Sequence, residues 1–293
     1  MTMRAFETKE ISHNDSFAVT FLYRSLLGRL LLKLLIKTTV SKIFGFTMER
    51  SISRIFIRSF IKRNNINMNE YEDVRYASFN EFFTRLIKKN LRSFSDNEGE
   101  LTAPCDGKLT AYPITANSTF RIKGSVYDVD GLLQDRALAD EFKNGVCLIF
   151  RLTPDDYHRF SFIDDGEILY QKRIKGVLHT VRPISQQKYN VYAQNSREYT
   201  VMQMANFGKV IQVEVGALFV GRITNHMMKG AFGRGDEKGV FEFGGSTVVM
   251  LFRENTVTVD DAIFEHTQQN KETIVRMGYR IGQRKTQRGE YRQ

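Results

Sequence analysis

The segment at residues 239–252 constrains the fold of this chain more than any other. It ends in five consecutive apolar residues, Val-Val-Met-Leu-Phe, and a run of this length and composition is typical of a buried strand. Gly244 and Gly245 come shortly before the run, and their backbone can bend and be approached closely. The hydroxyl of Ser246 therefore follows a carbonyl that it can attack, although most Gly-Gly-Ser-Thr segments are only tight turns.

The charge balance favours an anionic partner. Lys and Arg number 43 against 33 Asp and Glu, which gives the 293-residue chain a formal net charge of +10. Nucleic acid and an acidic membrane surface are the two partners that such a balance suits. The two cysteines, Cys105 and Cys147, are too few for a disulfide framework and form no cluster of metal ligands. We therefore expect a reducing compartment and no bound metal.

Two stretches near the N-terminus combine apolar and basic residues. Residues 21–36 are leucine-rich but are interrupted by Arg24, Arg29 and Lys33, so they fall short of the roughly 20 mostly apolar residues that span a bilayer. Residues 52–62 repeat the pattern with Ile, Phe, Arg and Lys. Both stretches suit helices that lie in the membrane interface. The alternative is that both helices pack on the core and turn a basic face to solvent.

The spacing of apolar residues predicts an α+β fold. Helical periodicity marks residues 17–36, 52–61 and 79–91, and Ser78 with Glu81 predicts a capping box at the start of the third helix. From residue 101 the chain changes to short β-rich runs separated by Gly, Asp and Asn. We therefore expect N-terminal basic amphipathic helices in a membrane-associating segment at residues 1–100. A mainly antiparallel β domain follows at residues 101–282, with a polar, basic tail at residues 283–293.

Four further blocks carry residues suited to catalysis. They are Ala-Pro-Cys-Asp-Gly-Lys at 103–108, the block at 150–160 that contains His158, Asn-Ser-Arg-Glu at 195–198, and Val-Gly-Ala-Leu-Phe-Val-Gly at 215–221. Each has a plain structural interpretation. Asp106 in its Asp-Gly pair fits a turn before a strand, and a histidine beside Asp, Tyr and Arg is often only a hydrogen-bonded structural residue.

Taken in order, these blocks resemble the phosphatidylserine decarboxylase family of pyruvoyl-dependent enzymes. The resemblance covers most of the chain and also includes Phe-Phe-Thr-Arg at 82–85 with Lys88 and Arg92, Lys229-Gly230, Arg234-Gly235 and Gly-Ser-Thr at 245–247. It implies that the chain cuts itself between Gly245 and Ser246 into a β chain, residues 1–245, and an α chain, residues 246–293. Ser246 would then become a covalent pyruvoyl group, which is the cofactor.

The resemblance also implies an activity and a set of catalytic residues. The pyruvoyl group forms a Schiff base with phosphatidylserine, and this carboxy-lyase reaction releases carbon dioxide and gives phosphatidylethanolamine for phospholipid biosynthesis. Asp106, His158 and Ser246 form the charge relay for self-cleavage, because a serine hydroxyl needs a base within hydrogen-bond reach. Arg159 and Arg197 are candidates for holding the substrate carboxylate.

The same resemblance implies the partners and the location of the protein. The partners are phosphatidylserine in the bilayer, an anionic membrane surface, and the α and β chains of the same precursor, with no nucleic acid. We expect a peripheral membrane protein on the cytoplasmic face of the cell membrane, and the sequence leaves a homo-oligomer open.

One position departs from the family pattern. Many members carry a second histidine three positions after the first, where this chain has Ser161. Either His158 serves both self-cleavage and decarboxylation, or another residue takes one of the two roles. His179 is the first candidate for that role and His226 the second.

Two other functions stay open on the sequence. A serine hydrolase can use the same three residues on an external substrate, but the Gly-x-Ser-x-Gly elbow of the common hydrolase fold is absent because Val248 and Val249 follow Thr247. A non-catalytic basic protein can bind nucleic acid or membrane through its net charge of +10. However, the sequence has neither zinc-finger spacing, nor an RNP-type motif, nor a basic-region heptad.

Overall fold

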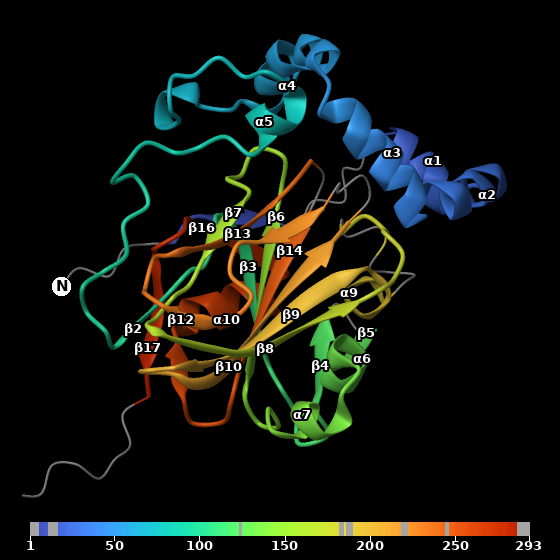
Figure 1. Ribbon diagram of the computed structural model, residues 1–293. Helices are drawn as coiled ribbons and strands as arrows, with labels where there is room; N and C mark the ends of the chain where they lie inside the picture. The colour runs from blue at the N-terminus through green and yellow to red at the C-terminus, as the bar shows by residue number, and fades with distance from the viewer. Residues whose placement is uncertain are drawn as a thin grey trace, which may run out of the picture.

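The centre of the molecule is a nine-stranded sheet in which every neighbouring pair is antiparallel (Figure 1). The computed structural model describes residues 6–10, 17–122, 125–181, 185, 190–217, 222–243 and 246–285. In sheet order the strands are β1 (Thr8–Glu10), β16 (Lys271–Val275), β3 (Gly107–Pro113), β6 (Val146–Leu152), β14 (Ser246–Phe252), β10 (Gly208–Gly216), β9 (Arg197–Met204), β8 (Gly166–Ile174) and β12 (Gly230–Phe232).

One face of this sheet is covered by two small sheets and a helix. The first small sheet consists of β11 (Ile223–Asn225), β13 (Glu237–Phe241) and β7 (Arg159–Ser161). The second consists of β15 (Val257–Val259), β17 (Arg280–Arg284) and β2 (Glu100–Thr102). The helix is α10 (Asp261–Gln268). Phe160, Phe241 and Ile263 from these elements share a hydrophobic core with Val248 and Met250 of β14. This core contains the face on which Ser246 also lies, because side chains alternate along a strand.

The opposite face is covered by a hairpin and short helices. These are β4 (Thr119–Ile122) with β5 (Ser125–Asp128), α6 (Val129–Leu133), α7 (Arg136–Asp140) and α9 (Val191–Gln194). Phe120 and Leu132 from this layer share a second core with Val249 and Leu251 of β14. Both faces of β14 are therefore buried, which explains why its sequence is an unbroken apolar run.

The N-terminal helices lie at one end of the sheet, and α1–α3 project to the side (Figure 1). They are α1 (Phe17–Arg24), α2 (Leu26–Leu35), α3 (Thr38–Met48), α4 (Ile55–Asn64) and α5 (Phe79–Phe83), with the 3-10 turns η1 (Ser51–Arg54) and η2 (Met68–Glu70) between them. Within the described part of the chain, none of the helices has both the length and the apolar character that a membrane-spanning helix needs.

The predicted α+β fold is confirmed, with local differences in the helical region. The stretch at 17–36 forms two helices because Ser25 interrupts it, and the Ser25 hydroxyl caps α2 by accepting from the N–H of Gly28 at 2.9 Å. The predicted capping box is present, since the N–H of Glu81 donates to the Ser78 hydroxyl at 3.2 Å and the Glu81 carboxylate accepts from the N–H of Ala77. The helix that starts at Phe79 ends at Phe83, whereas the apolar spacing predicted that it runs to residue 91.

Candidate active site

Ser246 is the first residue of the central strand β14. The register pairs it with Gly216 on β10 and with Leu152 on β6. The residue is fully buried, and its hydroxyl oxygen has no hydrogen-bond partner among the described residues. Leaving a buried hydroxyl unpaired costs free energy, so such an atom calls for a role other than stability. Gly244 and Gly245, the other part of the predicted cleavage site, lie outside the described residues.

His158 lies directly before β7 and has the properties of a neutral base. Its Nδ1 is 3.0 Å from the carbonyl oxygen of Asp156. Because a carbonyl oxygen only accepts, Nδ1 carries the proton and Nε2 presents a lone pair. Nε2 is buried and has no hydrogen-bond partner within the described part of the chain. Burial, helped by the positive charge of Arg85, lowers the pKa of His158 to about 3, so the ring is uncharged at neutral pH.

The chain that leads to Ser246 runs past His158. Phe241, at the end of β13, donates its backbone N–H to the carbonyl oxygen of His158 at 2.9 Å. Two residues later, the ring centroid of Phe243 lies 5.2 Å from that of Phe83. The Phe83 centroid in turn lies 4.1 Å from that of the His158 imidazole. The histidine and the residues before the predicted cleavage site therefore share one aromatic neighbour.

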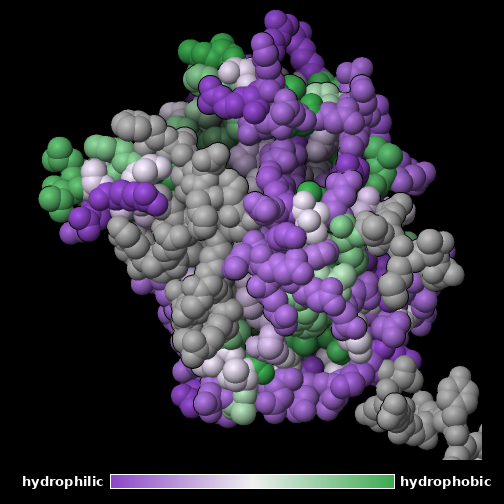
Figure 2. Space-filling model, turned by 180° about the vertical axis from the view of Figure 1, so that it is seen from behind, coloured by the Kyte–Doolittle hydropathy of each residue, from purple (hydrophilic) through white to green (hydrophobic). Residues whose placement is uncertain are grey.

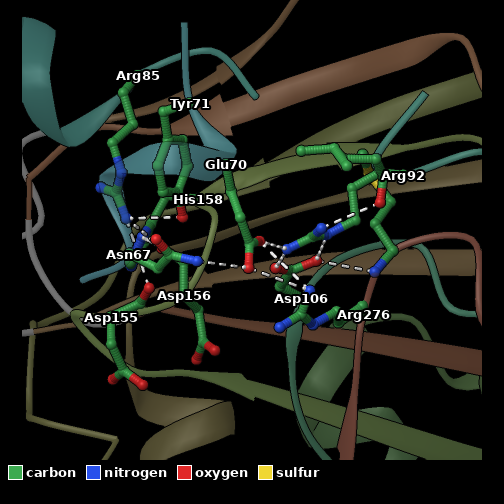
Figure 3. Close-up of polar contacts among 12 residues, drawn as sticks. Asn67, Glu70, Tyr71, Arg85, Arg92, Asp106, Asp155, Asp156, His158 and Arg276 are labelled. Carbon is green, nitrogen blue, oxygen red and sulfur yellow. Dashed lines mark hydrogen bonds and ion pairs between the residues drawn. The ribbon is translucent and has the colours of Figure 1, made fainter. Parts of the chain in front are cut away.

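Asp106 is buried, and its carboxylate binds Arg92 (Figure 3). The guanidinium donates from Nε at 2.8 Å and from Nη2 at 2.7 Å, and the same Nη2 lies 3.1 Å from a carboxylate oxygen of Glu70. The backbone N–H of Met277 adds a third bond to Asp106 at 2.9 Å. In the described contacts Asp106 and His158 share no hydrogen bond, so the predicted charge relay stays a prediction.

Ser161, which stands in place of the second histidine, lies on the Asp106 side of this site. Its hydroxyl donates to the sulfur of Met277 at 3.3 Å, and the backbone of Met277 donates to Asp106. Its backbone N–H donates to the carbonyl of Pro104, two residues before Asp106, at 2.9 Å. Position 161 therefore borders Asp106 through Met277, whereas His158 takes its orientation from a backbone carbonyl.

The Phe-Phe-Thr-Arg segment attaches the helical region to the His158 block. Arg85 turns inward and is 2% exposed, and its Nη2 donates to the carbonyl oxygen of Asp156 at 3.3 Å. In the other direction, Arg159 donates to the carbonyl oxygen of Thr84 from Nε at 3.0 Å and from Nη2 at 2.8 Å. A continuing helix would need that carbonyl for its own ladder, which explains why α5 ends at Phe83. The sequence motif at 82–85 was noted as part of the family resemblance, but it did not predict the contact of this segment with the block at residues 150–160.

The other candidate residues have partners of their own. Nδ1 of His179 lies 3.2 Å from a tyrosine hydroxyl of α1. Arg197 is buried and donates to four backbone carbonyl oxygens at 2.7–2.9 Å, which suits a cross-link inside the protein. Glu237 lies 2.8 Å from Nε2 of His226 and 2.6 Å from Nη1 of Arg159. The contact of His179 joins the β domain to α1, and those of Arg197, His226 and Arg159 join segments within residues 84–237.

Comparison with known proteins shows the family to which this chain belongs. Residues 79–283 match the phosphatidylserine decarboxylase family model. The chain belongs to the phosphatidylserine decarboxylase family, as the ordered blocks of the sequence predicted.

Three relatives show how far the similarity extends. The phosphatidylserine decarboxylase proenzyme 2 of Clostridium acetobutylicum is 49% identical over 281 residues, which are 94% of this chain and 96% of the relative. The proenzyme of Ruminiclostridium cellulolyticum is 41% identical over 267 residues, 89% of each chain. That of Clostridium botulinum strain Langeland is 40% identical over 269 residues, 90% of this chain and 91% of the relative. The similarity therefore includes the N-terminal helices as well as the β domain.

Proposed function

We propose that this chain is a phosphatidylserine decarboxylase proenzyme that cuts itself between Gly245 and Ser246. The observation that carries the proposal is the hydroxyl of Ser246, which is buried and has no hydrogen-bond partner among the described residues. Ser246 starts a central strand, and this strand lies within the residues that match the family model. The hydroxyl oxygen attacks the carbonyl carbon of Gly245, and the peptide C–N bond breaks as an ester forms. Elimination then releases Gly245 as a carboxylate and leaves a dehydroalanine at position 246. The imine tautomer of this residue reacts with one water molecule, which supplies the new carbonyl oxygen as ammonia leaves, and the product is the pyruvoyl group.

His158 is the base of this step. Its neutral ring presents Nε2, which takes the proton of the Ser246 hydroxyl and passes it to the amide nitrogen as the C–N bond breaks. Asp106 is the third member of the set, and its assignment rests on the family resemblance, since its bonds go to Arg92 and Met277. Asp106→Asn therefore tests that role separately from the role of the histidine.

Ser246 suits a covalent carbonyl cofactor at its position. Its hydroxyl oxygen has no hydrogen-bond partner among the described residues, and the residue is fully buried between two strands. A pyruvoyl group supplies a carbonyl that takes up the electrons left behind when carbon dioxide departs, as pyridoxal does in other enzymes. In this stage Nε2 of His158 takes up a proton from solvent water and passes it to the α-carbon of the substrate, which replaces the proton that decarboxylation consumes. The single histidine of the block then serves both stages.

Electrophoresis under denaturing conditions, followed by mass spectrometry, tests this proposal. We expect two polypeptides from the wild-type gene, the smaller beginning at position 246 with a blocked N-terminus. Ser246→Ala, His158→Ala and Asp106→Asn should each leave one intact and inactive chain. Ser118→Ala, which changes another buried serine, is the control and should be cut normally. An intact wild-type chain that decarboxylates phosphatidylserine would sink the proposal, and one that hydrolyses esters would favour a serine hydrolase.

We also propose that residues 1–100 bind an anionic bilayer and thereby hold the catalytic domain, residues 101–282, at the membrane surface. Helix α2 turns apolar side chains to solvent, and Figure 2 shows apolar surface on the part of the molecule that projects to the side. These side chains are Leu26, Leu27, Leu30, Leu31 and Leu34, which are 48–75% exposed. Arg24, Arg29 and Lys33 are exposed among them. An apolar face with basic neighbours suits an interfacial helix, and the substrate lipid is itself part of a bilayer.

Flotation with vesicles that contain phosphatidylserine tests the docking. Each basic residue near an anionic surface contributes about 1 kcal/mol, so changing Arg24, Arg29 and Lys33 to Glu should lower binding by at least about a hundredfold. The matched control makes the same charge change at exposed or half-exposed positions around α7 and β8, namely Arg136, Lys143 and Lys172. Equal losses in the two proteins would show that only net charge matters. Unchanged flotation of the protein with Glu at positions 24, 29 and 33 would contradict docking through α2. It would also contradict the proposed peripheral location at the cytoplasmic face of the cell membrane.

A further inference from the structure

The turn that leads to His158 is cross-linked through the carboxylate of Asp156. Lys108, on β3 and 4% exposed, places its Nζ 2.8 Å from both carboxylate oxygens. Thr153 donates its backbone N–H to Oδ2 at 2.6 Å, and its hydroxyl lies 2.9 Å from the same oxygen. Nζ of Lys108 also lies 2.5 Å from that hydroxyl. The cation, the carboxylate and the hydroxyl therefore contact one another across the turn. The carboxylate of Asp155 joins them, 3.5 Å from Nζ of Lys108 and 2.7 Å from the Thr153 hydroxyl.

The backbone carbonyl of Asp156 belongs to a second set of contacts (Figure 3). It accepts from Nδ1 of His158 at 3.0 Å and from Nη2 of Arg85 at 3.3 Å. Arg85 is itself fixed, because Nη2 lies 3.1 Å from the hydroxyl of Tyr71 and the guanidinium carbon lies 4.2 Å from the centre of that ring. One residue thus joins two buried cations, Lys108 through its side chain and Arg85 through its main chain.

We propose that Lys108 is a positioning residue for self-cleavage, and that it acts on His158 through Asp156. By fixing the Asp156 side chain, Lys108 holds the carbonyl of that residue against Nδ1 of the imidazole. A carbonyl in this place selects the tautomer that carries its proton on Nδ1, so Nε2 is ready to accept the proton of the Ser246 hydroxyl. The inference rests on the proposed self-cleavage of this chain.

The opposite tautomer shows why the position of the carbonyl matters. If the Asp156 carbonyl moved out of reach, the ring proton would be free to sit on Nε2, where it would point at the site instead of a lone pair. Such a ring cannot take a proton from Ser246. Lys108→Met is the change that would move the carbonyl, because it removes the cation that holds the carboxylate of Asp156, whose side chain is 12% exposed. Without this cation the carboxylate takes up a proton or turns toward another donor, and either change releases the turn.

Nitrogen NMR of His158 measures this tautomer directly. The measurement uses full-length Ser246→Ala protein with labelled histidine, and His158→Gln in the same background identifies the signals. We expect a proton on Nδ1 and none on Nε2 in the parent, and a mixture of tautomers in the Lys108→Met protein. Lys108→Arg, which keeps the cation, should keep the parent tautomer. Should Lys108→Met not fold, Thr153→Val removes the hydroxyl that Lys108 and Asp156 share and should show the same shift on a smaller scale.

The rate of self-cleavage is the second readout, in chains that keep Ser246. General base catalysis contributes about a hundredfold to ten-thousandfold, so Lys108→Met should cut at least about tenfold more slowly. Lys108→Arg should restore the rate to within about threefold of wild type. Lys209→Met is the matched control, because it removes another lysine bonded to a carboxylate, Glu141 at 2.8 Å, at the end of β10 far from Ser246. Its rate should not change.

The outcomes separate this inference from the proposed function. A folded Lys108→Met protein, or a folded Thr153→Val protein in its place, that holds the proton wholly on Nδ1 overturns the inference. That result stands whatever the cutting rate, because Lys108 would then be only structural. A wild-type chain that never cuts itself overturns the proposed function instead, and the tautomer of the uncut protein is measured either way.

Discussion

The precursor should lose stability as the pH falls, and His158 should account for a defined part of that loss. Burial, with the charge of Arg85, lowers the pKa of His158 from 6.5 to about 3. Between these two values the native state binds fewer protons than the unfolded chain, so the free energy of unfolding falls as the pH drops through this window. From about pH 7 to about pH 4.5, the two pKa values give a loss of about 2.5 kcal/mol from this residue alone.

Urea unfolding of two chains isolates this contribution. Ser246→Ala keeps the precursor uncut and removes no hydrogen bond that the described residues make. The second chain adds His158→Gln, whose amide can still donate to the Asp156 carbonyl but does not titrate. Carboxylates titrate in both chains, so the chain with histidine should lose about 2.5 kcal/mol more between the two pH values. Equal losses would refute the reasoning that the imidazole is buried in its neutral form.

Further predictions concern the surroundings of the site and the cut protein. Arg92→Met should lower the free energy of unfolding by about 3–5 kcal/mol, because it leaves the buried carboxylate of Asp106 without its cation, whereas Arg276→Met, at a site 46% exposed, should cost less than about 1 kcal/mol. Similar costs in urea unfolding would contradict this explanation. Phe83→Ala should cost about 3–5 kcal/mol and slow self-cleavage, since it removes the ring packed on the imidazole, and a normal rate of cutting on denaturing gels would argue against that contact. The two chains of the cut protein should elute together from a sizing column at neutral pH, because five buried apolar side chains of β14 each contribute about 1.5–3 kcal/mol to holding them together. Release of the fragment at 246–293 would contradict the central, buried position of β14.

The strand that carries Ser246 could be predicted from the sequence, but its neighbours could not. The unbroken apolar run indicates burial on both faces, and the side chains of β14 do divide between two core clusters. No local sequence pattern, however, predicts that Ser246 pairs with Gly216 and with Leu152. These pairings follow from the order of nine strands, which depends on contacts between residues far apart in the chain.

The polar partners of the site were also beyond the sequence. In a chain with a net charge of +10, basic residues suggest solvent or a membrane surface. Yet the side chains of Arg92 and Lys108 are each only 4% exposed and pair with carboxylates that are 8% and 12% exposed. The prediction that the helix reaches residue 91 was wrong because it, too, depends on a polar partner that the sequence does not reveal. Apolar spacing reports which face of a helix is buried, but it does not report that Arg159 takes the carbonyl of Thr84.

Two aspartates of the site are each paired with a cation, and in the described contacts neither carboxylate is a hydrogen-bond partner of the imidazole. Asp106 is bound by Arg92, and Asp156 by Lys108, so the group that touches Nδ1 is an uncharged carbonyl. A free carboxylate at that place would raise the pKa of His158 and favour a charged ring. The arrangement seen here keeps both the hydroxyl and the imidazole uncharged at buried positions, and therefore places no unpaired charge on these two groups in the resting precursor. For the proposed self-cleavage this means that the resting precursor bears the cost of two buried polar atoms that have no partner among the described residues, the Ser246 hydroxyl and Nε2 of His158. It avoids the larger cost of a buried charge without a partner.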